Sequence, residues 1–363
     1  MARVGLVFGG RSVEHRVSVD SARTVARASI EAGHQVLALG VAEDGAWADR
    51  ATSEAALAGE IDALESLGVP VAPTLSRLTA EPPEVVFPLI HGTWGEDGTL
   101  QGLCEMLDLP YVGAGVTASA LAMDKVAAKR ALAAAGLPVV EYAAVRRAAF
   151  ETDPRGFVEH AARLSGPPWF VKPSVGGSSV GVRKVADHAG LADAVAFALD
   201  FDDAVLVERG VAGRELEVAV LGHRELAASE IGEIVPGREF YDYEDKYLTD
   251  GAELIAPAVL TPAVRARLQE LAVAAFAALG GSGMARVDFL LEGETPYVNE
   301  INTLPGFTSI SMYPRLWALS GVPLAELVDR LVTHAFERHA DRRRLDDGIK
   351  EFLAALAGEK ARR

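Results

Sequence analysis

Three short apolar segments separated by helix-forming sequence occupy the first third of the chain and restrict its fold most strongly. They span Arg3–Phe8, Gln35–Val41 and Val85–Ile90. Helical periodicity covers Ser18–Ala32, and Asp44–Glu84 is interpreted as a helix with variable loops. Strands that alternate with helices are typical of a parallel sheet covered by helices. The sequence therefore predicts an α/β N-terminal part built on a parallel sheet.

The middle and last thirds predict a different arrangement. A helix over Thr117–Ala135 is expected to link the first third to a small, mostly antiparallel α+β lobe. The elements expected in that lobe are the helix Leu191–Leu199 and the strands Trp169–Pro173, Ser179–Val185, Ala204–Glu208 and Glu215–Leu221. The elements expected after it are the helix Pro262–Leu279, the strands Met284–Glu292 and Pro296–Asn302, and a charged, helical, peripheral tail from Arg338 on.

Composition narrows the class of protein. The 363 residues suffice for two or three domains, and 51 acidic against 35 basic residues give a net charge of −16. This balance disfavours binding to nucleic acid and to anionic membranes. A single cysteine, Cys104, excludes a disulfide framework and fits a reducing cytosol. Because the N-terminus does not resemble a signal peptide and the longest uncharged stretch, Leu271–Ala285, is too short to cross a membrane, we expect a cytoplasmic enzyme.

The last two predicted strands carry a candidate metal site. Side chains alternate along a strand, so Arg286 and Asp288 share one face, and Glu300 and Asn302 share a face of the next strand. If the hairpin brings these faces together, two carboxylates and an amide oxygen converge, as Mg²⁺ or Mn²⁺ requires. The alternative is a solvated polar face of an edge hairpin. The residues expected on the opposite, buried face are Val287, Phe289, Val298 and Ile301.

Lysine is rare here, with 7 lysines among the 35 basic residues, and Lys125, Lys172 and Lys246 stand in unusual local sequence. Chance could scatter a rare residue, but a lysine can also mark a position where its chemistry is needed. Lys172 precedes the Gly- and Ser-rich segment Pro173–Gly181, whose backbone N–H groups could bind phosphate oxygens. It is not a Walker motif, and a plain hairpin turn is the alternative.

Three further loops are candidates for a site. Phe240–Tyr247, between Pro236 and Gly251, is polar and aromatic, which favours a lid over a disordered surface loop. Gly9–Ser18 and His91–Gly98 follow predicted strands, where ligands of α/β sheets usually bind. The dinucleotide pattern G-x-G-x-x-G is absent, so a nicotinamide enzyme is disfavoured.

The acidic residues of the last two loops, Glu14, Glu96 and Asp97, are either site carboxylates or helix-start residues that complement the helix dipole. His15 and His91 are interpreted as structural rather than catalytic.

Taken together and in order, these segments closely resemble the D-alanine–D-alanine ligases of the ATP-grasp superfamily. The resemblance runs from about Val4 to Arg330, through GGRSVEHRVS, HGTWGEDGTLQG, AMDK, VKPSVGGSSVG, FYDYEDKY, MARVDF and VNEINTLPGFTSISMYP. It implies an N-terminal α/β (Rossmann-like) domain followed by a two-lobed ATP-grasp α+β fold. The expected divisions are a substrate-binding and dimerisation domain at 1–120, a central lobe at 121–212, a C-terminal lobe at 213–340 with the metal site and a lid at 236–252, and a charged tail at 341–363.

The resemblance also implies the reaction. The carboxylate of one D-alanine takes the γ-phosphoryl group of ATP, and the amine of a second D-alanine attacks the acyl phosphate. The product, D-alanyl-D-alanine, is a precursor of peptidoglycan. Transfer between two anions requires that their charge be neutralised by metal ions and cationic side chains.

The resemblance carries roles over to the matching residues. Asp288, Glu300 and Asn302 match the ligands of two Mg²⁺ ions, for which Mn²⁺ is expected to substitute. The residues that match ATP contacts are Lys125, Lys172, Ser179, Glu208, Arg209, Val211, Glu215 and the lid lysine Lys246. Glu14 matches the carboxylate that binds the ammonium of the first D-alanine, and Ser178 and Tyr247 match its hydrogen-bonding partners. Arg286 matches the group that stabilises the tetrahedral oxyanion. Ser311 and Met312 match the site of the carboxylate of the second D-alanine.

Two departures from the family pattern are Gly176, where a longer side chain is often found, and Arg16, where an acidic residue is common. A homodimer formed through the N-terminal domain is also implied. The rival hypotheses are a ligase that makes D-alanine–D-lactate or joins another carboxylate and amine, and a non-catalytic nucleotide sensor. The substrate-side residues argue against another pair of substrates, and the metal set with Lys246 argues against a sensor.

Overall fold

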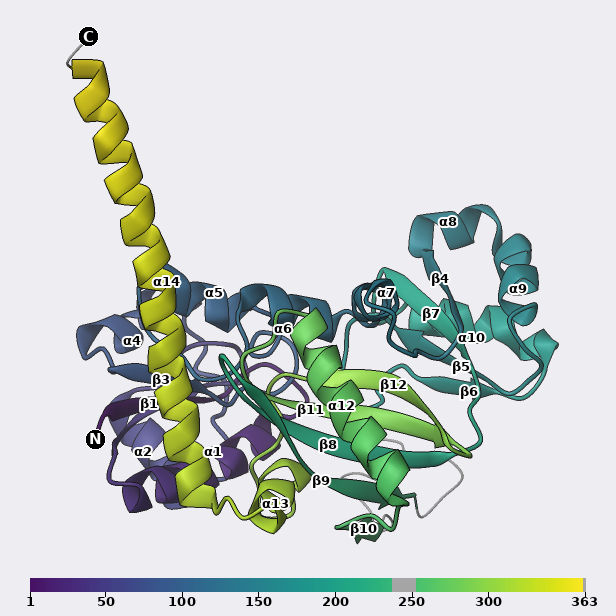
Figure 1. The fold of residues 1–363 in the computed structure, drawn as a ribbon, viewed down its shortest axis with the longest axis horizontal. Coiled ribbons are helices and arrows are strands. Elements are labelled where there is room, and N and C mark those ends of the chain that lie inside the picture. Colours follow the sequence, from purple (N-terminus) through teal and green to yellow (C-terminus); the bar gives the residue numbers. More distant parts are fainter. Residues whose placement is uncertain (237–252, 362–363) are drawn as a thin grey trace.

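The computed structural model describes residues 1–236 and 253–361, with side chains described as far as residue 357. Three sheets follow one another along its long axis (Figure 1). The first sheet contains β1, β2 and β3, the second lies at the opposite end, and the third lies between them. Within the described residues, no helix combines the length and the apolar character needed to cross a membrane.

The first sheet is parallel, with strand order β2–β1–β3, as the alternation of strands and helices predicted. Its strands are β1 (Arg3–Gly9), β2 (Gln35–Val41) and β3 (Val85–Pro88), so that β3 ends two residues before the predicted boundary. The helices around it are α1 (His15–Glu31), α2 (Arg50–Ala58), α3 (Val71–Thr74), α4 (Ser76–Ala80) and α5 (Thr99–Met106). The segment Asp44–Glu84 thus holds three short helices rather than one.

The single helix predicted over Thr117–Ala135 is wrong, because the chain forms two helices, α6 (Val116–Met123) and α7 (Lys125–Ala134). Asp124, between them, has extended backbone dihedrals, and its carboxylate accepts hydrogen bonds from the backbone N–H groups of Val126 and Ala127. A short acidic side chain is stabilised as an N-cap, which ends one helix and starts the next.

The second sheet is antiparallel, with strand order β4–β7–β5–β6. Its strands are β4 (Tyr142–Arg146), β5 (Trp169–Pro173), β6 (Arg183–Val185) and β7 (Ala204–Arg209). Its helices are α8 (Arg147–Thr152), α9 (Pro154–Ala162), the 3₁₀ turn η1 (His188–Gly190) and α10 (Leu191–Ala198). The predicted strand Ser179–Val185 is wrong in its first half, because Ser179 has a positive φ of 59° that an extended strand does not allow.

The third sheet is antiparallel, with order β10–β9–β8–β11–β12. Its strands are β8 (Arg214–Gly222), β9 (Leu226–Val235), β10 (Glu253–Ile255), β11 (Gly283–Glu292) and β12 (Thr295–Asn302). The strand Glu215–Leu221, expected in the small lobe, is therefore the centre of this sheet. Helix α12 (Pro262–Ala278) packs with Leu216 and Val218, whereas α13 (Met312–Leu319) packs with Ala219 and Leu221 on the other face.

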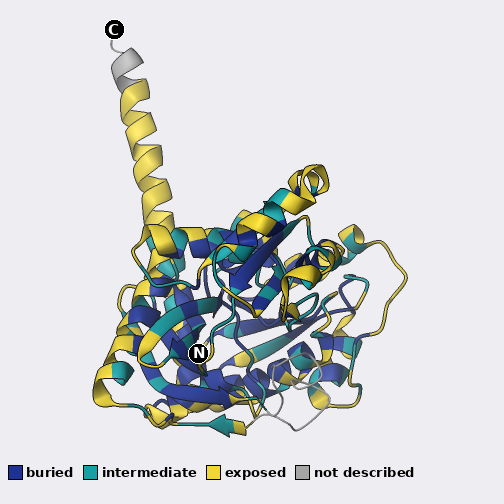
Figure 2. Ribbon diagram, turned by 90° about the vertical axis from the view of Figure 1, so that its right-hand side faces the viewer, coloured by how far each residue is buried: buried dark blue, intermediate teal, exposed yellow. Residues whose placement is uncertain are grey.

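The C-terminal helix α14 (Leu324–Ala361) is part of the core at its start and leaves the body at its end (Figure 1). The projecting end of α14 is exposed (Figure 2). Leu327 and Leu331, in contrast, share one buried cluster with Leu6 of β1 and Leu221 of β8. The first and third sheets are therefore joined by one hydrophobic core, and the domain boundaries predicted at 120, 212 and 340 stay predictions.

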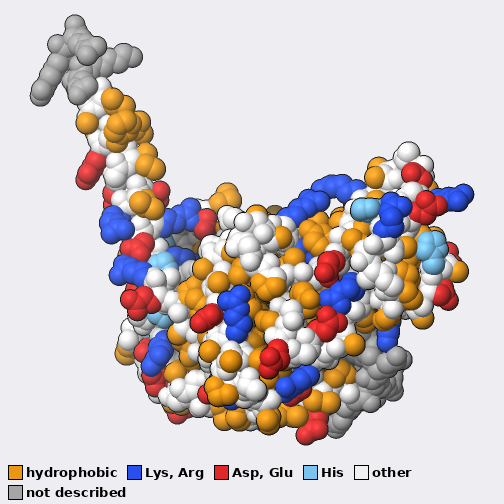
Figure 3. Space-filling view, turned by 45° about the vertical axis from the view of Figure 1, so that its right-hand side comes forward, with side chains coloured by type: hydrophobic (Ala, Val, Ile, Leu, Met, Phe, Trp, Pro, Cys, Tyr) orange, Lys and Arg blue, Asp and Glu red, His pale blue; other side chains and the backbone are white. Residues whose placement is uncertain are grey.

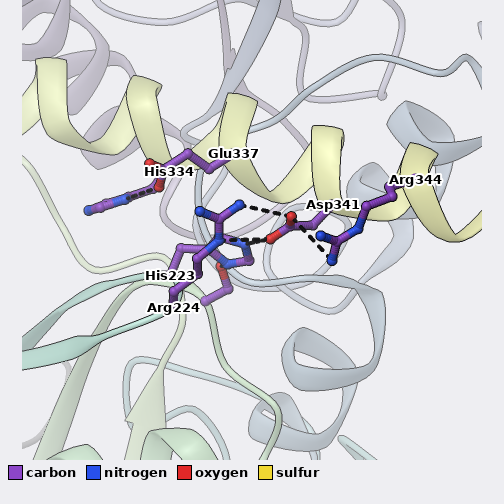
Figure 4. Close-up of polar contacts among 7 residues, drawn as sticks. His223, Arg224, His334, Glu337, Asp341 and Arg344 are labelled. Atoms are coloured by element: carbon purple, nitrogen blue, oxygen red, sulfur yellow. Dashed lines mark hydrogen bonds and ion pairs between the residues drawn. The ribbon is translucent and has the colours of Figure 1, made fainter.

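The expectation that the tail is peripheral from Arg338 on is wrong for its first turn. The Arg338 side chain is half-buried, donates hydrogen bonds to the carbonyls of Tyr111 and Gly113, and lies over the Tyr111 ring. Asp341 accepts hydrogen bonds from Arg224 at 2.9 and 3.1 Å and lies 3.1 Å from His223 Nε2 (Figure 4). Beyond these contacts the helix projects, with hydrophobic side chains on its surface (Figure 3). They are Leu345, Ile349, Phe352, Leu353 and Leu356.

Candidate active site

One cavity of about 770 Å³ collects every predicted site residue that the structure describes. Those residues are Glu14, Lys125, Lys172, Ser178, Ser179, Glu208, Arg209, Val211, Glu215, Arg286, Asp288, Glu300, Asn302, Ser311 and Met312. They come from the second and third sheets and from loops, including the loop after β1 that carries Glu14. Lys246 and Tyr247, with the rest of the predicted lid from 237 to 252, lie outside the described residues.

The hairpin of β11 and β12 brings the predicted polar faces together. Arg286 pairs with Asn302 across the two strands, and Asp288 pairs with Glu300. A bulge follows Asp288, so that Asn299 is an extra residue in β12. The residues expected on the opposite face, Val287, Phe289, Val298 and Ile301, are all buried as predicted. The bulge is needed for this, since Val298 and Ile301 are three residues apart and regular alternation would place them on opposite faces.

The Asp288 carboxylate is the centre of a charged group on this hairpin. Arg286 donates to both of its oxygens at 2.7 Å, and the Asn302 amide nitrogen donates at 2.9 Å. Arg286 also lies 3.2 Å from Glu217 of β8. Burial opposes the charge of Arg286, but Asp288 and Glu217 outweigh it and raise its pKa.

The hairpin fits a divalent cation by the chemistry of its donors. Asp288 and Glu300 offer carboxylate oxygens from paired positions, and Asn302 offers an amide oxygen once its side chain turns. Within residues 1–236 and 253–361, no three His, Cys, Asp or Glu side chains form a metal-binding group. A metal would therefore be held by two carboxylates and one amide, with its remaining positions open to phosphate oxygens and water.

The glycine-rich loop is held at both its start and its middle. At its start, Ser174 donates to the Asp124 cap at 2.5 Å, and the Val175 N–H donates to Asp202 at 2.8 Å. Further along, Lys125 donates to the Gly176 carbonyl at 2.6 Å. The loop does join a hairpin, β5 to β6, but Ser178 and Ser179 both have positive φ, at 50° and 59°. A fixed, irregular backbone of this kind is typical of an anion-binding loop rather than of a plain turn.

A buried carboxylate lies beside this loop, between two lysines. Glu208 Oε1 is 2.7 Å from Lys129 Nζ, and Glu208 Oε2 is 2.5 Å from Lys172 Nζ. Burial opposes the ionised carboxylate, but the two ammonium groups outweigh it and lower the pKa of Glu208 to about 2. In the same way, Glu208 outweighs burial and raises the pKa of Lys172. Glu208 and Lys172 are therefore both charged at neutral pH.

Comparison with known proteins agrees with this geometry. Residues 3–114 match the family described as D-ala D-ala ligase N-terminus, and residues 131–333 match D-ala D-ala ligase C-terminus. The chain belongs to the D-alanine–D-alanine ligase family. The D-alanine–D-alanine ligase of Chloroherpeton thalassium is 42% identical over 94% of this chain and 98% of the relative. D-alanine–D-alanine ligase A of Escherichia coli is 43% identical over 93% of this chain and 96% of the relative.

Solved structures of the ligase family show the same fold. The D-alanine–D-alanine ligase from Coxiella burnetii has a TM-score of 0.79 and 32% identity, covering 96% of this chain and 99% of that one. The VanG D-Ala:D-Ser ligase from Enterococcus faecalis has a TM-score of 0.78 and 31% identity, covering 92% and 99%. The α/β ATP-grasp fold expected from the resemblance is confirmed.

At the substrate side expected for a ligase, Glu14 and Ser178 meet from different parts of the chain. Ser178 Oγ of the glycine-rich loop donates a hydrogen bond to Glu14 Oε1, just before α1. At the N-terminus of α13, Ser311 Oγ lies 2.8 Å from Thr308 Oγ1. Because the glycine-rich loop bonds directly to the N-terminal part, an anion held by the loop would lie close to a ligand held by Glu14.

Arg209, which the resemblance matched to an ATP contact, is bound by two carboxylates. Its guanidinium donates to Glu141 at 2.9 Å and to Glu292 at 2.9 and 3.2 Å. These bonds raise its pKa and tie the side chain to the two neighbouring strand ends. Arg209 therefore borders the cavity as a fixed wall rather than as a cation directed at a phosphate.

Both ring nitrogens of His15 and of His91 have partners within the protein, which fits the structural role expected of them. His15 Nδ1 lies 2.7 Å from the Gly10 carbonyl, and its Nε2 accepts a bond from the Leu64 N–H at 2.9 Å. His91 is held between Ser21 Oγ at 3.0 Å and the Leu304 carbonyl at 3.1 Å, and burial lowers its pKa.

Three residues at the site were missed as site residues or left undecided. Glu217 forms an ion pair with Arg286. It stands two residues after Glu215 on a predicted strand and therefore on the same face, and this pattern could have identified it. Glu96 lines the cavity, and burial together with the charges of Glu14 and Glu300 raises its pKa. Lys129 stands four residues after Lys125 on α7, and the rarity of lysine was the signal that could have found it.

Proposed function

We propose that this protein joins two D-alanines to D-alanyl-D-alanine with ATP as the phosphoryl donor. The observation that supports this most is the cavity in which Glu14 and Ser178, the glycine-rich loop with its lysines, and the Asp288–Glu300–Asn302 hairpin meet. A carboxylate site, a phosphate site and a metal site in one space are what ligation through an acyl phosphate requires.

Each group of side chains has a part in this reaction. Glu14, held by Ser178, binds the ammonium group of the first D-alanine and so directs its carboxylate toward the nucleotide. Lys125 and Lys172 lie beside the loop that receives the phosphates. Arg286 stabilises the oxyanion that forms when the second amine attacks, while Ser311 and Met312 receive the carboxylate of the second D-alanine.

Asp288, Glu300 and Asn302 would hold Mg²⁺, which when bound supplies positive charge against the phosphate oxygens during transfer. A second ion, substitution by Mn²⁺ and a homodimer formed through the N-terminal domain belong to the same proposal. Cytoplasmic residence is also proposed, from the single cysteine Cys104 and the acidic composition.

The test is phosphate release from ATP and Mg²⁺ with D-alanine, together with chromatography of the product. We expect D-alanine-dependent phosphate release and a dipeptide in equal amount. Phosphate release that does not depend on D-alanine would contradict a ligase, and nucleotide binding without any turnover would support the sensor hypothesis.

The acceptor is tested by adding D-serine or D-lactate beside D-alanine, because the VanG structural neighbour is named a D-Ala:D-Ser ligase. We expect D-alanyl-D-alanine as the main product near neutral pH. A dominant D-alanyl-D-serine or D-alanyl-D-lactate product would reassign the acceptor and leave the phosphoryl transfer unchanged.

A further inference from the structure

Lys129 is a buried cation that the proposed chemistry does not use. Its side chain is 2% exposed, and it does not line the cavity. Among the described residues, its ion-pair partner at the cavity is Glu208, whose other oxygen binds Lys172. Lys172 is 16% exposed and does line the cavity. The three side chains therefore form a line from the interior to the cavity, with the carboxylate in the middle.

The geometry around Glu208 is fixed on every side. Its strand neighbours are Tyr142 on β4 and Phe170 on β5. The Tyr142 ring lies 5.8 Å from Lys129 Nζ, which adds a cation–π contact on the interior side. Lys129 comes from the helix whose first residue, Lys125, bonds to the glycine-rich loop. One rigid helix thus holds both the loop and the carboxylate.

The charge balance of this line explains why two lysines are present. A carboxylate paired with Lys172 alone would form a neutral pair and cancel the charge that faces the cavity. With Lys129 sharing the carboxylate, Glu208 no longer neutralises Lys172 by itself, which leaves more positive charge facing a cavity where Glu300 and Glu215 also act on Lys172. Positive charge in a poorly solvated place attracts an anion strongly, so this arrangement favours the binding of a phosphate at Lys172.

We propose that Lys129 is a positioning residue for the nucleotide, acting through Glu208 to keep Lys172 directed at the phosphates. This inference rests on the proposed function only in taking the cavity to be the ATP site. Without the Lys129 charge, Glu208 binds Lys172 alone, and Lys172 loses attraction for an anionic ligand. The chemical step, which takes place at the β11–β12 hairpin, keeps its own groups.

The experiment measures the affinity of the whole protein for Mg·ADP by calorimetry, together with kcat and KM for ATP. We expect Lys129→Met to raise the Kd for ADP and the KM for ATP by about tenfold or more, the effect of one hydrogen bond to a charged group. We expect kcat to stay within about threefold. Lys350→Met, a paired lysine on the exposed part of α14, serves as the control and should change neither.

A second substitution separates the indirect route from a direct contact. If Lys129 acts through Glu208, then in a Glu208→Gln protein the further change Lys129→Met should alter the Kd by less than about twofold. Equal and additive losses in the two backgrounds would overturn the proposal. Lys129→Gln, which can still donate to Glu208 without charge, replaces Lys129→Met if that variant does not fold, and the same increase in Kd is expected.

The remaining outcomes are also decisive. An unchanged ADP affinity with a lower melting temperature would show a merely structural lysine. If the wild-type protein binds ADP but forms no dipeptide, the proposed function fails, while the change in the Kd for ADP on substitution of Lys129 still tests the inference about Lys129. If wild type binds no ADP, both proposals fail.

Discussion

Replacing Asp288 by Asn tests the metal site with the least change in shape. The carboxylate accepts three hydrogen bonds, at 2.7, 2.7 and 2.9 Å, from Arg286 and Asn302. An amide keeps one acceptor oxygen, and Arg286 keeps Glu217 at 3.2 Å. The loss of one charged hydrogen bond should therefore lower the free energy of unfolding by about 1–3 kcal/mol, which leaves a protein of this size folded.

The effect on catalysis should be much larger than the effect on stability. Loss of an anionic metal ligand removes charge stabilisation worth several kcal/mol in the transition state. A loss of about 4 kcal/mol corresponds to about a 10³-fold lower kcat. The assay is phosphate release at saturating ATP and D-alanine over a titration of Mg²⁺, with thermal unfolding recorded for the same samples.

The control is Glu294→Gln, which removes the same charge from the turn of the same hairpin, outside the cavity. Its kcat should equal that of wild type. A folded Asp288→Asn protein with kcat within about threefold of wild type at saturating Mg²⁺ would refute the assignment of the metal site.

Three further predictions concern the lid and the C-terminal helix. Lys246→Ala should lower kcat more than it raises the KM for ATP, because a lid lysine is expected to act in the transition state. Steady-state kinetics measure both constants, and a change in KM alone would indicate a ground-state contact instead. Tyr247→Phe should gain D-lactate ligation, most clearly at low pH where the D-alanine amine is protonated, and chromatography of products from both acceptors decides it. Asp341→Asn should destabilise the protein near neutral pH, because hydrogen bonds from Arg224 and His223 lower the pKa of Asp341 to about 2. A carboxylate whose pKa is lowered stabilises the fold at pH values above its ordinary pKa of 3.8, and this effect is lost as the pH falls through about 2. The stabilities of the two proteins, measured by unfolding, should therefore converge at about that pH. A difference that stays constant with pH would contradict this.

The hairpin of β11 and β12 shows how much of the site can be predicted from the alternation of side chains along a strand. Alternation placed Arg286 with Asp288 correctly, because a face pattern depends only on neighbouring residues. It could not place the extra residue Asn299, because a bulge is set by the pairing partner. The convergence of the hairpin with the loop around Ser178 and with Glu14 depends on contacts between distant segments, and only the family resemblance indicated it.

The helix predicted over Thr117–Ala135 failed for a local reason that the sequence did contain. Asp124 lies in the middle of a helical pattern, and its side chain competes for backbone N–H groups. Helical periodicity continues on both sides of it, so the pattern concealed the cap. The strands β4 and β9 were missed because their partners, β7 and β8, supply the reason for their extended form.

The core that joins α14 to the first sheet also sets the order in which the chain can fold. Val4, Leu6 and Phe8 are synthesised more than 300 residues before Leu327 and Leu331, yet they share one buried cluster with them. At about 5–20 residues per second, roughly 15 to 60 seconds pass between the two. During that time this apolar face of the first sheet lacks the partner that covers it in the folded protein, and exposed apolar surface of this kind is prone to aggregation.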